Sequence, residues 1–135
     1  MIKDNKVTIL LIDDDLAINY YHNRLFSKIE WIESILTSKN GKEGIDTITD
    51  LIKNKTKDDI IYIFLDINMP IMNGWEFLAE FDKIQNTIPF NYKIYILSSS
   101  INKDDSDKAE SNPLVTKFLN KPLLMEHVLK FNQFH

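Results

Sequence analysis

The stretch FLDINMPIMNGWEFL, residues 64–78, places one aspartate directly after an apolar run and follows it with Met69-Pro70 and Asn73-Gly74. An apolar run of this length is typical of a buried strand, and Pro and Gly are typical of the loop that follows a strand. Asp66 therefore stands where a predicted strand ends, and Gly74 is expected to permit a backbone turn before the next helix. A carboxylate in that position needs partners from other parts of the chain.

Short apolar runs alternate with longer segments of helical period along the whole chain. This pattern is typical of a parallel sheet covered by helices on both faces. Five strands are predicted, at residues 7–12, 32–36, 60–65, 93–97 and 116–120. The first, third and fourth are almost purely apolar and are expected to be central, whereas the second and fifth are more mixed, as edge strands are. The predicted fold class is α/β, with a doubly wound sheet of five parallel strands.

Apolar residues at helical spacing lie between these strands and predict helices that pack on the sheet. The sets that line one helix face are Ile18, Tyr21 and Leu25; Ile45, Ile48 and Ile52; Phe77, Leu78 and Phe81; and Leu124, Val128 and Phe131. The segment 101–115 has the weakest period, so a short or mobile helix is expected there. The most polar segment, KNKTKDD at 53–59, is predicted to be a loop.

The composition limits the classes of function. With 135 residues, 44% of them hydrophobic and 27% charged, the chain is expected to form one soluble globular domain over residues 1–135. A formal charge of −4 and scattered basic residues argue against direct nucleic-acid binding, and no apolar run is long enough to cross a membrane. The absence of cysteine excludes disulfides and thiolate metal sites, and the lack of an export signal predicts a cytoplasmic protein.

Polar residues follow four of the five predicted strands, and in a doubly wound sheet the site lies at the carboxyl ends of the strands. These residues are Asp13, Asp14 and Asp15 after the first strand, Asp66 after the third, Ser98 after the fourth and Lys121 after the fifth. Neighbouring carboxylates repel each other, so a cation must offset them, and oxygen ligands without His or Cys favour Mg²⁺. The sequence therefore predicts a phosphoryl-transfer site with Asp66 as nucleophile and with Ser98 and Lys121 as donors.

Four motifs, LLIDDD, LDINMPIMNG, LSS and KP, occur in order over nearly the whole chain. With this set the sequence resembles the receiver domain of two-component response regulators, of the stand-alone type represented by the chemotaxis receiver. The resemblance implies the flavodoxin-like strand order 2-1-3-4-5. It also implies a phospho-acceptor that is not a turnover enzyme. Because the chain ends soon after its last predicted helix, no output domain is expected.

Residue by residue, the resemblance implies how the acceptor and the metal are held. Asp66 accepts the phosphoryl group and shares in binding Mg²⁺, Asp14 binds Mg²⁺ directly, and Asp13 supports it through water. Asn68 supplies a backbone carbonyl to the metal, and its side chain lies beside the phosphoryl group.

The other matching positions imply a switch. Ser98 stands where the family has Thr or Ser, Lys121 matches the lysine before proline, Phe118 matches an aromatic residue that turns inward upon phosphorylation, and the Lys121-Pro122 bond is expected to be cis. The implied donor is a phosphohistidine on a histidine kinase or a histidine phosphotransfer protein. The implied output is an unidentified downstream protein that contacts the face of the fourth helix, fifth strand and fifth helix, or relay of the phosphoryl group.

Simpler roles are open for individual residues. The acids at 13–15 also suit a helix N-terminus, and Asp15 is expected to be a helix cap. The serines at 98–100 suit a turn, and Lys121 on its own resembles a surface lysine. The three histidines, His22, His127 and His135, form no cluster in the sequence and are expected to be solvated.

Two other functions remain open. One is an interaction module that keeps the receiver fold but is not phosphorylated. The other, less favoured, is an aspartyl-phosphate phosphatase of the haloacid dehalogenase type, in which Asp13 and Asp15 would form the nucleophile motif. That motif expects Thr or Val soon afterwards, where Leu16 and Ala17 stand.

Overall fold

The computed structural model describes residues 6–99 and 102–131 of the chain. Five parallel strands form one sheet in the order β2-β1-β3-β4-β5, which confirms the predicted order and places β2 and β5 at its edges. The strands are β1 (Lys6–Ile12), β2 (Ile32–Ser38), β3 (Asp59–Asp66), β4 (Asn91–Ser98) and β5 (Val115–Asn120). Their bounds differ from the predicted ones by no more than two residues.

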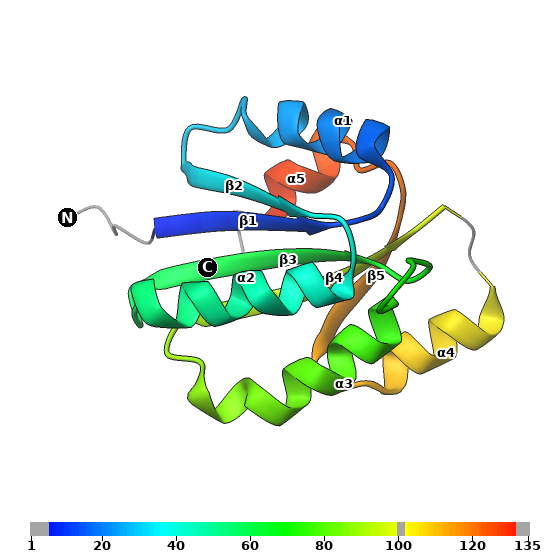
Figure 1. Cartoon of the computed structure of the whole chain (residues 1–135). Coiled ribbons are helices and arrows are strands. Elements are labelled where there is room, and N and C mark those ends of the chain that lie inside the picture. The colour runs from blue at the N-terminus through cyan, green and yellow to red at the C-terminus, as the bar shows by residue number, and fades with distance from the viewer. Residues whose placement is uncertain (1–5, 100–101, 132–135) are drawn as a thin grey trace.

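Helices cover both faces of the sheet (Figure 1). They are α1 (Leu16–Phe26), α2 (Gly41–Asn54), α3 (Gly74–Ile84) with the short 3₁₀ helix η1 (Gln85–Thr87), α4 (Lys103–Ser111) and α5 (Met125–Phe131). Helices α1 and α5 lie on one face, and α2, α3 and α4 lie on the other (Figure 1). None of the helices in the described part of the chain is long and apolar enough to span a membrane.

The alternation of side chains along the strands separates the core into two apolar clusters. On β1, Val7, Ile9 and Leu11 pack with residues of α1 and α5, whereas Leu10 and Ile12 pack with residues of α2, α3 and α4. Every residue of β3 is buried, as expected for the central strand of a sheet covered on both faces. Its last residue, Asp66, is therefore held by a strand that packing fixes on both sides.

The weakly periodic segment before β5 does contain a short helix. Helix α4 has nine residues, and Ala109 is its buried residue. The predicted loop at 53–59 is shorter than expected, because α2 continues to Asn54 and β3 begins at Asp59. Ser100, which follows the fourth strand, lies outside the described residues.

Helix α1 buries a face that matches the predicted one only in part, because Leu25 is buried as expected but its two predicted neighbours on that face are not. Tyr21 is 41% exposed and Ile18 is only partly buried, whereas Asn19, His22 and Phe26 point into the protein. The expectation that the histidines are solvated is therefore wrong for His22, which is 1% exposed. Asn19 and His22 replace Ile18 and Tyr21 on the buried face because both polar side chains find hydrogen-bond partners in the interior, and apolar periodicity does not detect such partners. His127 is partly buried, and His135 lies outside the described residues.

Ile71, in the loop between β3 and α3, has a backbone φ of 69°. This left-handed conformation is strained for a β-branched residue, and the side chain is 77% exposed, so little packing offsets the strain. Replacing Ile71 with asparagine, which tolerates this conformation, is expected to raise the free energy of unfolding by about 1 kcal/mol. Urea denaturation measures the change, and Ile71→Val, which keeps the β-branch, is the control expected to stay near wild type. Equal stability of all three proteins would contradict the prediction.

Candidate functional site

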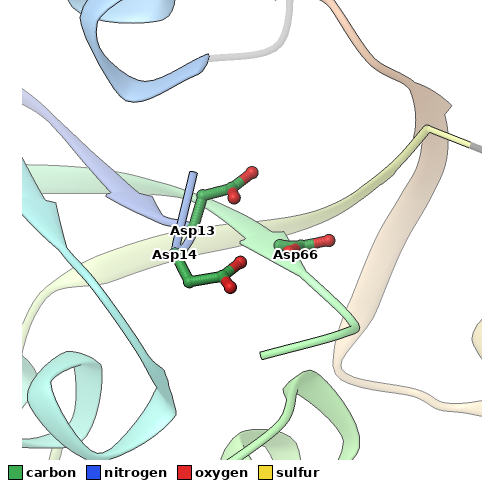
Figure 2. Close-up of side chains that lie close together, drawn as sticks. All are labelled: Asp13, Asp14 and Asp66. Atoms are coloured by element: carbon green, nitrogen blue, oxygen red, sulfur yellow. The ribbon is translucent and has the colours of Figure 1, made fainter. Parts of the chain in front are cut away.

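Three carboxylates meet at the carboxyl ends of β1 and β3. Asp13, Asp14 and Asp66 each offer one oxygen such that the three oxygens lie within 4.8 Å of one another, and their side chains extend to the same side (Figure 2). Asp13 and Asp66 are buried, and Asp14 is exposed. Asp15 has a different role, because its side chain accepts hydrogen bonds from the backbone N–H groups of Ala17 and Ile18. The prediction that Asp15 caps a helix is confirmed.

The ammonium of Lys121 enters this cluster from the turn after β5. Its Nζ lies 2.9 Å from Asp13 Oδ2 and 3.4 Å from Asp66 Oδ1. The backbone N–H of Lys121 donates to the carbonyl of Ser98 over 2.9 Å, and the Lys121-Pro122 bond is cis, as expected. Burial alone would lower the pKa of the Lys121 ammonium, but the hydrogen bond and charge of Asp13, followed by those of Asp66, raise it above its ordinary value. The lysine is therefore charged at neutral pH.

Asp13 is held on several sides. Its backbone N–H donates to the carbonyl of Ser38 over 3.0 Å, which extends the pairing of β1 with β2. Its Oδ1 accepts from the backbone N–H of Asp15, while Oδ2 accepts from Lys121. Its carbonyl accepts from Asn19 Nδ2 over 2.8 Å. Neither Ser38 nor Asn19 was among the residues predicted for the site, because both act through the backbone of Asp13.

The end of β3 lies very close to the start of α3. A Cβ added to Gly74 would lie 2.5 Å from the Asp66 carbonyl oxygen and 2.9 Å from the Ile67 Cα, and the Gly74 N–H donates to the Ile67 carbonyl over 2.8 Å. Among the described residues no glycine has a positive φ. Glycine is therefore needed before α3 for the close approach of two backbones and not for a left-handed φ.

Replacing Gly74 with alanine is expected to lower the free energy of unfolding by about 2 kcal/mol, because the new methyl group meets backbone atoms that have no room to move. Urea denaturation measures the loss. Ala79→Ser, on the exposed side of the same helix, is the control and is expected to change the stability by less than about 0.5 kcal/mol. A Gly74→Ala protein as stable as this control would contradict the close-approach interpretation.

The electrostatics of the site favour a divalent cation. Burial, followed by the negative charge of Asp13, raises the pKa of Asp66 to about 6, and the ammonium of Lys121 opposes this shift. One lysine therefore only partly offsets three acids. The donor set of the cluster consists of carboxylate oxygens, which suit a hard cation such as Mg²⁺.

The remaining predicted residues lie around this cluster. Ser98 is buried at the end of β4 and is joined to Lys121 through its carbonyl. Asn68 is exposed on the loop that follows β3. Phe118 is partly buried against the core cluster on the α4 side, and its strand partner is Ile96, two residues before Ser98. The structure thus brings together Asp13, Asp14, Asp66 and Lys121. Ser98 and Asn68 lie on adjoining segments, and Phe118 lies within β5, three residues before Lys121.

Comparisons with known proteins point to one family. Residues 9–131 match the family model of the response regulator receiver domain. A protein-glutamate methylesterase/protein-glutamine glutaminase of Methanococcoides burtonii is 31% identical over 122 residues, which cover 90% of this chain but 31% of that protein, so the chain spans about a third of the length of this relative.

Solved structures give the same fold. The crystal structure of a two-component response regulator from Cytophaga hutchinsonii aligns with a TM-score of 0.79 and 27% identity, and the alignment covers 96% of each chain. The receiver domain of the histidine kinase CKI1 from Arabidopsis thaliana, crystallised with Mg²⁺, aligns with a TM-score of 0.77 and 17% identity over 98% of this chain and 96% of that one.

Proposed function

The chain belongs to the response regulator receiver domain family, and on that premise we propose that it accepts a phosphoryl group on Asp66 in a Mg²⁺-dependent reaction. Members of this family are phospho-acceptors of two-component signal transduction, not turnover enzymes. The observation that carries the proposal is the meeting of three carboxylate oxygens within 4.8 Å, two of the acids also in contact with one lysine.

In the proposed reaction a carboxylate oxygen of Asp66 forms a bond to phosphorus while the bond from phosphorus to an imidazole nitrogen of the donor breaks. The ammonium of Lys121, already 3.4 Å from Asp66, donates to a phosphoryl oxygen. Bound Mg²⁺ would offset the charge that the acids and the phosphoryl oxygens bring together.

The contacts of the acids support different roles for Asp13 and Asp14 in binding the metal. Both oxygens of Asp13 already accept hydrogen bonds, one from the Asp15 N–H and one from Lys121, which suits support through water. Asp14 is exposed and suits direct binding together with Asp66. The backbone carbonyl of Asn68, on the loop after β3, would be a further ligand. The Mg²⁺ in the crystallised CKI1 receiver domain supports the proposal that Mg²⁺ is the metal here.

Receiver domains interact with histidine kinases or phosphotransfer proteins, and we infer that such a protein is the donor here. The proposed switch begins at Ser98 and Lys121, which one backbone hydrogen bond already joins. Attraction of both to the phosphoryl group would draw in the end of β4 and change the surroundings of Phe118 at the face of α4, β5 and α5. The output is a contact of this face with a downstream protein, or relay of the phosphoryl group.

The phosphatase alternative receives little support from the site. It needs Asp15 as the second acid of a nucleophile motif headed by Asp13. The Asp15 carboxylate instead caps α1 through the N–H groups of Ala17 and Ile18.

The test is phosphorylation by a small donor. The protein is incubated with Mg²⁺ and acetyl phosphate, and its intact mass is measured beside Asp66→Asn and Asp15→Asn. A single labile phosphate adduct is expected on the wild type and on Asp15→Asn, in which asparagine still caps the helix, and none on Asp66→Asn or without Mg²⁺. A wild-type protein that binds Mg²⁺ but takes no phosphate would favour an interaction module that keeps the receiver fold.

A further inference from the structure

Helix α1 presents two polar side chains, Asn19 and His22, to the interior of the domain. They lie one helical turn apart and are 6% and 1% exposed. Neither belongs to the motifs that define the site. Each nevertheless forms a hydrogen bond to the backbone of a segment that carries a site residue.

Asn19 binds the segment after β1. Its Nδ2 donates to the carbonyl of Asp13 over 2.8 Å, whereas its Oδ1 is buried and has no hydrogen-bond partner among the described residues. A buried acceptor without a partner destabilises a fold by about 1–3 kcal/mol. An apolar side chain would avoid that penalty, so packing alone does not account for asparagine here. The bond to Asp13 does.

His22 binds the turn after β5. Its Nε2 accepts from the backbone N–H of Leu123 over 3.0 Å, and Leu123 is fully buried two residues after Lys121. Burial lowers the pKa of His22 to about 4, with the charge of Asp13 opposing and that of Lys121 adding to the shift. The imidazole is therefore neutral at neutral pH, and its Nε2 lone pair is available to this N–H.

The hydrogen bond of His22 helps to hold the backbone that carries the flexible side chain of Lys121. Lys121 has a long side chain with many rotamers, so its ammonium is only as well placed as the backbone that carries it. That backbone is anchored before the side chain by the Lys121 N–H on Ser98 and after it by the Leu123 N–H on His22. Helix α1 thus connects the Asp13 end of β1 with the turn that carries Lys121, and it lies on the same face as α5, beside that turn (Figure 1).

We propose that Asn19 and His22 are positioning residues for phosphoryl transfer: Asn19 fixes Asp13, and His22 fixes the turn that presents Lys121 to Asp13 and Asp66. This inference rests on the proposed function and deepens it. It gives α1 a part in the reaction through two side chains that hold the backbone of site segments.

The first test removes the acceptor of Leu123. His22→Leu fills the interior with an apolar side chain that accepts no hydrogen bond. His22→Gln supplies an amide oxygen as acceptor, with a reach similar to that of Nε2. With acetyl phosphate and Mg²⁺, the rate of adduct formation is expected to fall about tenfold in His22→Leu and to stay within about twofold of wild type in His22→Gln. Hydrogen exchange at the Leu123 amide is expected to speed up in His22→Leu and not in His22→Gln.

A double-mutant cycle separates positioning from a general structural effect. In a Lys121→Met background, His22→Leu is expected to slow the reaction by less than about twofold, because the group that it positions is absent. An undiminished tenfold loss in that background would mean that His22 acts independently of Lys121, and the inference would be overturned.

Asn19 is tested through the metal. Asn19→Leu is expected to weaken Mg²⁺ binding about tenfold in calorimetry, because the backbone of a metal-supporting acid loses its anchor. Asn23→Leu, the same change one turn later on α1, is the control and is expected to bind Mg²⁺ as the wild type does. Equal affinities of the two variants would overturn the role of Asn19.

The outcomes distinguish this inference from the function on which it rests. A wild type without a phosphate adduct would overturn both. A wild type that is phosphorylated beside an equally fast His22→Leu, or beside equally slow His22→Leu and His22→Gln, would overturn only the positioning role. If His22→Leu does not fold, His22→Asn replaces it, since its shorter amide does not reach the Leu123 N–H and the same loss is expected.

Discussion

Replacing Lys121 with methionine is expected to lower the free energy of unfolding by about 3 kcal/mol near neutral pH without divalent cations. The ammonium contacts both Asp13 and Asp66, and the side chains of all three residues are almost fully buried. Methionine fills a similar volume but leaves two carboxylates facing each other without a neighbouring cation. The destabilisation therefore comes from charges left uncompensated and not from lost packing. Urea denaturation in the presence of a chelator measures it.

A second lysine provides a matched control. Lys42 Nζ lies 3.4 Å from Asp46 Oδ2, the same distance that separates Lys121 from Asp66, but both of these side chains are 65% exposed. Lys42→Met is expected to change the stability by no more than about 0.5 kcal/mol. If the acids hold Mg²⁺ as proposed, added Mg²⁺ is expected to restore much of the stability of Lys121→Met, because an ion bound to the folded state would replace the missing positive charge. Equal losses in the two variants would contradict this account of the site.

The sheet could be predicted well because its signal is local. A parallel strand that is covered on both faces reads as an almost purely apolar run, and the predicted runs at 7–12, 60–65 and 93–97, which became β1, β3 and β4, have this form. The mixed composition of β2 and β5 marked them as edges for the same reason. Helix α1 was different, since its inward face contains Asn19 and His22, and a count of apolar residues selected Ile18 and Tyr21 instead.

The meeting of the acids with Lys121 could also be predicted, because parallel strands bring their carboxyl ends to one rim of the sheet and each of these residues follows a strand. The residues that hold the acids and Lys121 in place could not be predicted in this way. Ser38 and His22 act on segments 25 and 101 residues away in sequence, and both hydrogen bonds involve a backbone group that no sequence pattern displays. Gly74 was identified as important for a turn, whereas the distance to the Asp66 carbonyl that explains it exists only in three dimensions.

Ionisation of Asp66 is expected to lower the free energy of unfolding, and the loss can be measured by comparing the wild type with Asp66→Asn. In the folded protein the pKa of Asp66 is raised to about 6 from an ordinary value of 3.8, first by burial and then by the charge of Asp13. The folded state therefore holds this proton more tightly than the unfolded state. Its contribution to stability is complete below the ordinary pKa and is lost as the pH rises through about 6. A shift of this size corresponds to about 3 kcal/mol.

The pH profile of the wild type alone would hide this effect. The pKa of His22 is lowered to about 4 by burial, so the unfolded state binds a proton more readily and stability falls as the pH drops from the ordinary value of 6.5 toward 4. The two groups thus act in opposite directions over nearly the same range. The difference between wild type and Asp66→Asn removes the His22 contribution, which both proteins share.

Asp66→Asn is therefore expected to be more stable than the wild type by about 3 kcal/mol near neutral pH without divalent cations, and to match it near pH 4. Mg²⁺ is expected to reduce this difference in stability near neutral pH, because in the proposed site the Asp66 carboxylate binds the ion and the variant has no carboxylate there. Asp59→Asn is the control at the other end of β3. There the carboxylate accepts from the Thr56 N–H over 2.8 Å and lies 4.0 Å from Lys55, so the same substitution is expected to destabilise by about 1 kcal/mol. A gap between wild type and Asp66→Asn that is absent near neutral pH, or that is equally large near pH 4, would mean that the charge on Asp66 does not oppose folding.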